Sequence, residues 1–250
     1  MSRFLCIACE IFARPIYLSA ATSPHVIDVD LIPRGLHDQP EELKTTLQQR
    51  IDLAEGKGYE AILLGYGLCG NGTAGLQTRS VKVVIPRVHD CIGLLLGSRK
   101  RYREQFEKNP GTYWYSQDFV ERSDPDNKFA FMGPISNQEL ARQYDAFVVK
   151  FGRENADYLM EVMGTWKSHY QRAIWIDSGI NDDENLTKNI ETDAGKRGWS
   201  FEKLAGDLIL FRKMLNGDWV SFEDPDLVVV PINHALEPTY DERIFRCGSI

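Results

Sequence analysis

Short apolar runs alternate with amphipathic stretches along the first half of the chain, and this alternation limits the possible folds more than any other feature. The apolar runs are predicted strands over residues 3–8, 25–32, 59–65 and 81–86. Residues 40–56 begin with proline, carry acids in the first turn and place apolar side chains at helical spacing, which predicts a helix. The pattern indicates an α/β fold with Rossmann-like layers on a parallel sheet.

Residues 109–137 are rich in aromatic residues, proline, glycine and aspartate, which is typical of a long connection or a lid. Further strand and helix patterns follow it. The sequence therefore predicts an α/β subdomain over residues 1–110, a connection or lid over 111–139 and a second, similar α/β subdomain over 140–250. Whether the strands of the two halves form one sheet or two is left open.

Composition excludes several classes of partner. The 250 residues carry a formal net charge of -7, which argues against nucleic-acid binding because phosphate recognition relies on clustered lysine and arginine. No apolar run approaches the roughly 20 residues that span a bilayer, and the first residues lack a signal-peptide pattern, so we expect a cytoplasmic protein without a membrane partner. In that compartment the five cysteines are expected to be reduced.

Cysteine and histidine side chains follow each of the first four predicted strands. Since parallel strands end at one edge of a sheet, these residues are expected to meet in one pocket. Thiolate and imidazole are preferred ligands of zinc and of other transition metals. The predicted metal ligands are Cys9, His37, Cys69, His89 and Cys91. We expect the three cysteines to bind the ion directly, while the two histidines compete for a fourth position.

Glycines surround Cys69 in the segment GYGLCGNGTAG. Their spacing matches neither a dinucleotide-binding loop nor a P-loop, but Gly67, Gly70 and Gly72 are predicted to place backbone amides against a cofactor or substrate. Arg87 is a candidate for holding a carboxylate or phosphate group of that small molecule.

The same segment supports a metal-free alternative. Exposed amides and a nearby cation would lower the pKa of Cys69, making it a catalytic nucleophile with His89 as its base. A non-catalytic cofactor-binding module is a further alternative, so the sequence leaves open whether the chain is an enzyme. Each cysteine also has a structural interpretation as a small buried apolar residue, which is the one we prefer for Cys6.

Five segments carry a family resemblance: ACE at 8–10, GLHDQP at 35–40, LGYGLCGNGTAGL at 64–76, IPRVHDCIGLLLGSRKRY at 85–102 and NPGTYW at 109–114. Together they resemble the bacterial and archaeal family catalogued as domain of unknown function 1638. Members of that family occur beside corrinoid-dependent methyltransferase systems. The resemblance therefore implies a role in corrinoid-linked one-carbon metabolism, with a corrinoid as a possible cofactor and a corrinoid or methyltransferase protein as a partner.

Overall fold

The computed structural model describes residues 1–122, 148–149, 152–153, 170–180, 183–219, 224–239 and 241–249. The chain forms two compact units. The first contains Met1–Tyr102 together with Gly206–Ile250, and the second contains Arg103–Ala205. The first unit is thus discontinuous in sequence, whereas the division predicted above at residues 110 and 140 is contiguous.

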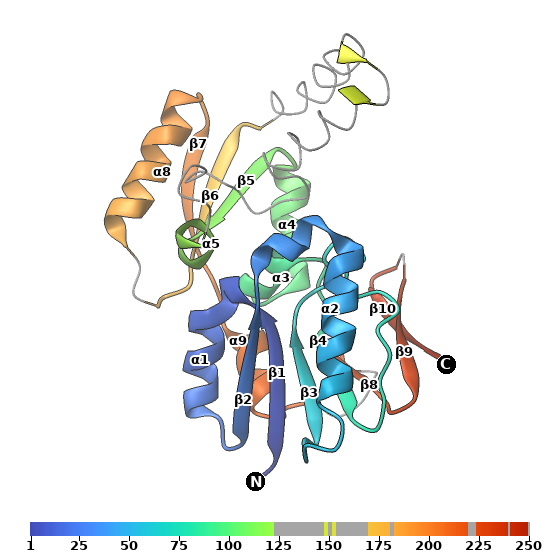
Figure 1. Ribbon diagram of the computed structural model, residues 1–250. Coiled ribbons are helices and arrows are strands. Elements are labelled where there is room, and N and C mark those ends of the chain that lie inside the picture. Colours follow the sequence, from blue (N-terminus) through green and yellow to red (C-terminus); the bar gives the residue numbers. More distant parts are fainter. Residues whose placement is uncertain are drawn as a thin grey trace. The chain divides into compact units, whose positions relative to one another are not determined.

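A five-stranded sheet forms the centre of the first unit (Figure 1). Its strand order is β2-β1-β3-β4-β8. The first four of these strands are parallel, as predicted, and β8 pairs with β4 in the antiparallel direction. The strands are β1 (Arg3–Cys9), β2 (Val26–Ile32), β3 (Ala61–Gly65), β4 (Lys82–Pro86) and β8 (Leu227–Val230). The predicted α/β fold with Rossmann-like layers is confirmed.

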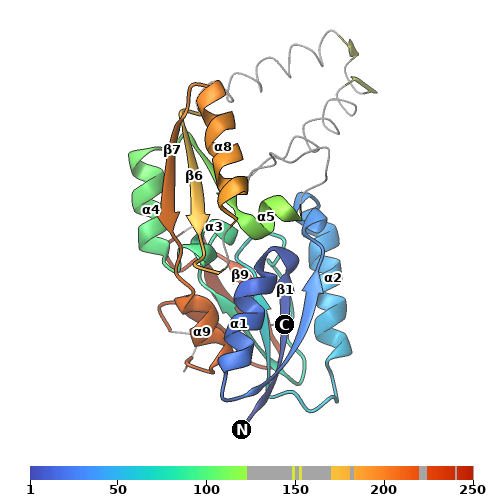
Figure 2. The ribbon, with the colours of Figure 1, turned by 90° about the vertical axis from the view of Figure 1, so that its left-hand side faces the viewer.

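Helices cover both faces of this sheet (Figure 2). Helices α1 (Ala13–Thr22) and α9 (Ile209–Leu215) lie together on one face, and α2 (Pro40–Leu53) lies on the other. Helix α2 begins with proline, and two glutamates in its first turn interact favourably with the positive end of the helix dipole. It buries Leu43, Leu47 and Ile51, which are four residues apart and therefore share one face of the helix.

Shorter elements complete the first unit. Two 3-10 helices, η1 (Glu10–Phe12) and η2 (Arg34–Asp38), follow β1 and β2. Two helices follow β4: α3 (Cys91–Leu95) and α4 (Arg99–Lys108), which continues into the second unit. Gly97 separates them with a φ of +68°. Strands β9 (His234–Pro238) and β10 (Phe245–Ser249) form an antiparallel hairpin.

The second unit has a parallel three-stranded sheet in the order β5-β6-β7. The strands are β5 (Thr112–Ser116), β6 (Arg172–Asp177) and β7 (Ser200–Ala205), and the helices include α5 (Gln117–Glu121) and α8 (Glu184–Lys196). Tyr113, Tyr115 and Trp175 form its core with Ile190 and Ala194 of α8. Strand β5 lies inside the predicted connection 111–139, whose remainder from residue 123 lies outside the described residues.

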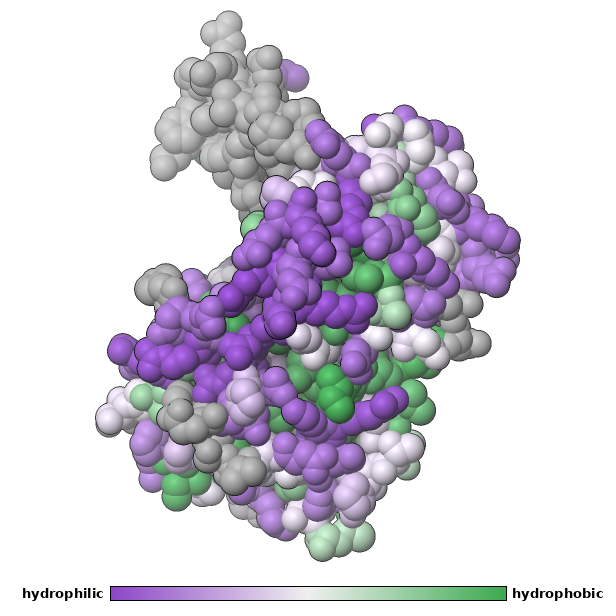
Figure 3. Space-filling model, turned by 180° about the vertical axis from the view of Figure 1, so that it is seen from behind, coloured by the Kyte–Doolittle hydropathy of each residue, from purple (hydrophilic) through white to green (hydrophobic). Residues whose placement is uncertain are grey.

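The face seen in Figure 3 carries mainly hydrophilic side chains, with apolar residues interspersed. No helix among the described residues is long and apolar enough to cross a membrane.

Candidate functional site

The strand order of the first unit places its candidate site between β1 and β3. The chain runs outward from β1 to β2 on one side and then returns past β1 to β3 and β4 on the other. In open parallel sheets, ligands bind beyond the carboxyl ends of the strands at such a switch point, where the loops diverge. Cys9 is the last residue of β1, and the loop that follows β3 carries Cys69.

Two backbone hydrogen bonds join the loop after β3 to the loop after β4. Leu68 N–H donates to the carbonyl of Val88 at 3.0 Å, and Cys69 N–H donates to the carbonyl of His89 at 2.8 Å. Gly67 allows this close approach, because a Cβ there would lie 2.7 Å from the carbonyl oxygen of Val88. The loop that carries Cys69 and the loop that leads into Cys91 are therefore held against each other.

Cys69 itself has a left-handed backbone with a φ of +47°. Its carbonyl accepts a hydrogen bond from Gly72 N–H at 3.0 Å, closing a turn whose central residues, Gly70 and Asn71, also have positive φ. This is the geometry of a type I′ turn. A left-handed non-glycine residue is uncommon, and such strain is often retained at functional positions.

Cys91 is the first residue of α3. Asp90 caps this helix by accepting hydrogen bonds from Ile92 N–H at 3.0 Å and Gly93 N–H at 3.1 Å. The other carboxylate oxygen of Asp90 accepts a hydrogen bond from the hydroxyl of Tyr102 at 2.9 Å. These contacts fix the backbone from which the Cys91 thiol projects.

The three thiols lie close enough to influence one another electrostatically. The pKa of Cys69 is raised to about 12, mainly by burial; a backbone hydrogen bond with Gly67 lowers it, and Cys9 and Asp90 make smaller contributions that raise it. Burial also raises the pKa of Cys91, with contributions from Asp90, Cys69 and Cys9. The structure thus places the three cysteines predicted as ligands within electrostatic reach of one another, and burial favours the protonated thiols of Cys69 and Cys91.

Tyr66 adds a polar atom to this cluster that the sequence did not indicate. It follows β3 directly and is 3% exposed, yet its hydroxyl has no hydrogen-bond partner among the residues that the structure describes. Burial raises its pKa most, followed by the charges of Cys9 and Cys69 and then those of Asp30 and Glu10. The charged groups that shift the pKa values of Tyr66, Cys69 and Cys91 are therefore cysteines and carboxylic acids, which are negative when ionised.

The two predicted histidines lie differently. His89 is exposed, and it is connected to Cys69 through its backbone carbonyl. His37 is half-buried in η2. Within the part of the chain that the structure describes, neither imidazole hydrogen-bonds a cysteine. The described His, Cys, Asp and Glu side chains also form no group of three or more that could hold a metal ion in this conformation.

Arg87 contacts the protein itself. Its guanidinium donates hydrogen bonds to the carbonyls of Asp224 at 2.9 Å, Arg243 at 2.7 Å and Phe245 at 3.2 Å. These bonds hold the chain around β8 and β10 and give the buried arginine a structural role. Of the glycines predicted to face a ligand, Gly70 lies exposed in the turn, whereas a Cβ on Gly72 would meet Leu43 of α2 at 2.7 Å.

Comparison with known proteins gives one match. Residues 31–215 match the family described as Protein of unknown function (DUF1638). The chain belongs to the DUF1638 family. The part that matches the DUF1638 family includes Tyr66, Cys69, His89 and Cys91, whereas Cys9 precedes it. No curated protein and no solved structure matches the chain.

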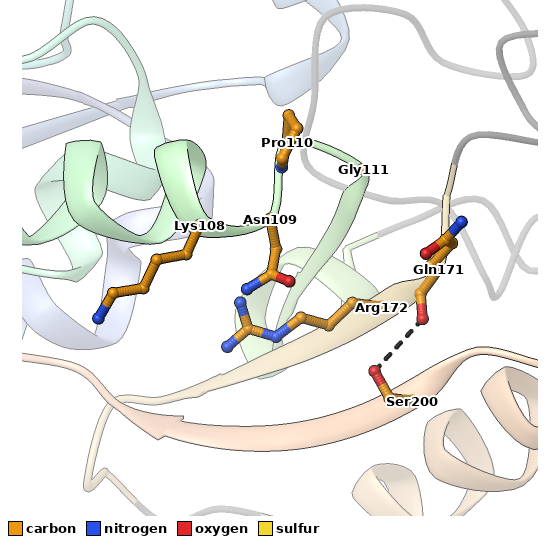
Figure 4. A pocket seen from close by; sticks show the side chains of 7 residues that line it. All are labelled: Lys108, Asn109, Pro110, Gly111, Gln171, Arg172 and Ser200. Atoms are coloured by element: carbon orange, nitrogen blue, oxygen red, sulfur yellow. Dashed lines mark hydrogen bonds between the residues drawn. The ribbon is translucent and has the colours of Figure 1, made fainter.

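The second unit has a polar cavity of about 350 Å³ (Figure 4). Its lining residues are Lys108, Asn109, Pro110, Gly111, Gln171, Arg172 and Ser200. Arg172 already donates to Gln105 at 3.0 Å and pairs with Glu202. The cavity lies where β5, β6 and β7 begin, which is the edge opposite to the usual ligand edge of a parallel sheet. The cysteine cluster of the first unit is therefore the stronger candidate.

Proposed function

We propose that this DUF1638 protein binds a thiophilic metal ion, with zinc as the first candidate, through the thiolates of Cys9, Cys69 and Cys91. The observation that supports the proposal is the position of these three cysteines beyond the carboxyl ends of β1, β3 and β4, within electrostatic reach of one another. Thiolate is the ligand type that zinc prefers, and three protein ligands leave a fourth position for a further group.

The electrostatics of the cluster support a cation rather than an anion. Asp90, Asp30 and Glu10 add negative charge to the surroundings of the thiols and of Tyr66. Burial destabilises the thiolate form, and neighbouring carboxylates destabilise it further. Such thiols therefore ionise readily only when a cation binds beside them. Binding would therefore release thiol protons to solvent and tighten as the pH rises.

The donor chemistry fits a metal ion, although the thiols are not arranged as ligands in the described structure. Each cysteine has a single χ1 angle, and rotation about it moves the sulfur between staggered positions without moving the backbone. The backbone is held in place at all three positions, by β1, by the Cys69–His89 hydrogen bond and by the Asp90 cap. Side-chain rotation is thus the change that the proposal requires.

His37 and His89 both remain candidates for the fourth position. A zinc ion with an open fourth position activates a bound water or thiol. Such a site would suit either an enzyme or an accessory protein that accepts a small molecule. The role in corrinoid-linked methyl transfer, with a corrinoid as cofactor or a corrinoid protein as partner, stays a prediction from the family resemblance.

The metal-free alternative receives less support. A nucleophilic Cys69 needs a lowered pKa, whereas burial raises the pKa of this thiol to about 12. The hydrogen bond with Gly67 does lower the pKa of Cys69, as expected for a glycine amide, but burial outweighs it and the net shift is upward. The candidate base, His89, also makes no side-chain hydrogen bond to Cys69.

Elemental analysis of purified protein tests the proposal, joined to zinc titration of metal-free protein against a chromophoric chelator. Wild-type protein is expected to bind one equivalent of zinc, and Cys9→Ser, Cys69→Ser and Cys91→Ser are each expected to lose it. Cys247→Ser is the matched control, because this thiol lies on β10 and outside the cluster. Equal zinc binding by wild type and all three cluster variants would exclude the site.

A further inference from the structure

Strand β2 forms one edge of the five-stranded sheet (Figure 1). Successive residues of a strand direct their backbone N–H and C=O groups to alternate sides, and Val26 N–H bonds to the carbonyl of Ser2 on the β1 side. The backbone groups of Ile27, Val29 and Leu31 therefore point away from β1. No strand among the described residues pairs with them. This edge offers a row of hydrogen-bond donors and acceptors to another strand.

Strand β2 also lacks the features that usually protect an edge strand from pairing, which are short length, burial, lysine, proline or a bulge. The other edge strands of the two larger sheets have such features. Strand β8 has four residues, all buried, β5 is buried throughout, and β7 carries Lys203. Strand β2 has seven residues, most of them partly exposed, contains neither lysine nor proline, and pairs with β1 without a bulge. Its open edge therefore indicates an interaction surface.

The sequence of this strand, VIDVDLI, is nearly palindromic in character. Reading outward from Val29, both directions give an aspartate and then two branched apolar residues. If two copies of β2 pair in the antiparallel direction with Val29 at the centre, each residue faces one of its own kind. The facing pairs are Val29 with Val29, Ile27 with Leu31, Val26 with Ile32 and Asp28 with Asp30. This self-complementarity is what a twofold interface between identical chains requires.

We infer that two copies of this chain associate through β2, pairing in the antiparallel direction around a twofold axis at Val29. The five-stranded sheets of the two copies then form one continuous sheet. The Val29 N–H of each copy donates to the Val29 carbonyl of the other, and the outward groups of Ile27 and Leu31 extend the ladder on both sides. Branched apolar side chains that face each other across paired strands stabilise the pair. The inference is independent of the proposed metal site.

The charges of β2 fit this arrangement. Asp28 of one copy would face Asp30 of the other, and like charges in that position destabilise a strand pair. Both acids are already paired within their own chain, Asp28 with Arg3 at 2.5 Å and Asp30 with Arg50 at 3.5 Å. The hydroxyl of Tyr59 also donates to Asp28 at 2.8 Å. The two acids and two arginines of each copy carry no net charge together, so the arginines allow the two edges to approach.

A charge exchange at Val29 tests the inference by analytical ultracentrifugation in the micromolar range. A chelator is present, so that metal-linked association does not contribute. Wild type is expected to sediment as a dimer. Val29→Lys and Val29→Glu should each sediment as a monomer, because like charges then meet on the axis. Their mixture should form a dimer again, because lysine now faces glutamate. Ile232→Lys is the control and should remain a dimer, since this exposed residue follows β8 at the other edge of the sheet.

Three outcomes would overturn the inference. A monomeric wild type would exclude the dimer, and dimeric Val29→Lys and Val29→Glu would place the interface elsewhere. Two monomeric variants that stay monomeric when mixed would show that Val29 does not lie on the axis. Circular dichroism shows whether the variants are folded. Arg50→Ala provides a test that leaves β2 unchanged: its dimer should dissociate at a several-fold higher concentration than wild type, and an equal dissociation constant would contradict the proposed pairing of charges.

Discussion

The backbone N–H of Cys69 donates a hydrogen bond to the carbonyl of His89 at 2.8 Å. This bond ties together two loops that follow neighbouring parallel strands, β3 and β4. Cys91 lies two residues beyond His89, so the bond also determines how far apart the backbones of two predicted ligands lie. The arrangement of the cluster thus depends on backbone contacts as much as on the cysteines.

Gly67→Ala should separate these loops. The added Cβ would lie 2.7 Å from the carbonyl oxygen of Val88 and 2.9 Å from the amide nitrogen of Asp90, which are backbone atoms that cannot rotate away. We expect the free energy of unfolding to fall by about 1–3 kcal/mol, as for an overpacked site, and zinc binding to be lost. Urea denaturation and zinc titration measure the two effects. Gly35→Ala is the control, because a Cβ there meets nothing within 4 Å, and equal behaviour of the two variants would contradict the prediction.

The left-handed backbone of Cys69 can be tested separately from its thiol. Glycine adopts a positive φ without steric penalty, whereas alanine does not. Metal-free Cys69→Gly should therefore be more stable than metal-free Cys69→Ala by about 1 kcal/mol, although neither variant has a thiol. Urea denaturation of the pair measures this difference. A more stable alanine variant would show that the chain at this position does not retain its φ of +47°.

Asp90→Ala should disturb the start of α3 and the position of Cys91. Loss of the cap is expected to lower the free energy of unfolding by about 1–2 kcal/mol and to weaken zinc binding. Asp183→Ala is a matched control in the second unit, since Asp183 caps α8 by the same type of contact, with Asn185 N–H and Leu186 N–H. It should lower stability similarly and leave zinc binding unchanged. Zinc loss in both variants would point to a general effect of lower stability.

Stability should decrease at alkaline pH through Cys6, a fully buried thiol of β1. Burial raises its pKa from 9.0 to about 12. Since the folded-state pKa lies above the unfolded one, the protonated thiol stabilises the fold fully below about pH 9, and this contribution is lost as the pH rises to about 12. The slope from one such group approaches about 1.4 kcal/mol per pH unit. Urea denaturation of metal-free wild type and Cys6→Ala across this range should show a shallower slope in the variant, and equal slopes would contradict the assignment.

Most strands of the first unit could be predicted from sequence, because strands buried on both faces are continuous apolar runs. Strand β7 could not, since SFEKLA is largely exposed and contains Glu202 and Lys203, which are compatible with a helix. Pairing with β6 determines its conformation. Strand β5 lies beside proline and glycine, and its aromatic residues become a core only once α8 packs against them.

The sequence alone determined that Cys9, Cys69 and Cys91 follow predicted strands. Because parallel strands end at one edge of a sheet, it also placed the three cysteines at the same edge. Only the tertiary structure decided that the Tyr66 hydroxyl is buried without a hydrogen-bond partner among the described residues and that Arg87 holds the C-terminal segment. Local pattern can place a residue at the end of a strand. Hydrogen bonding and burial depend on segments far apart in the chain, and these meet only after folding.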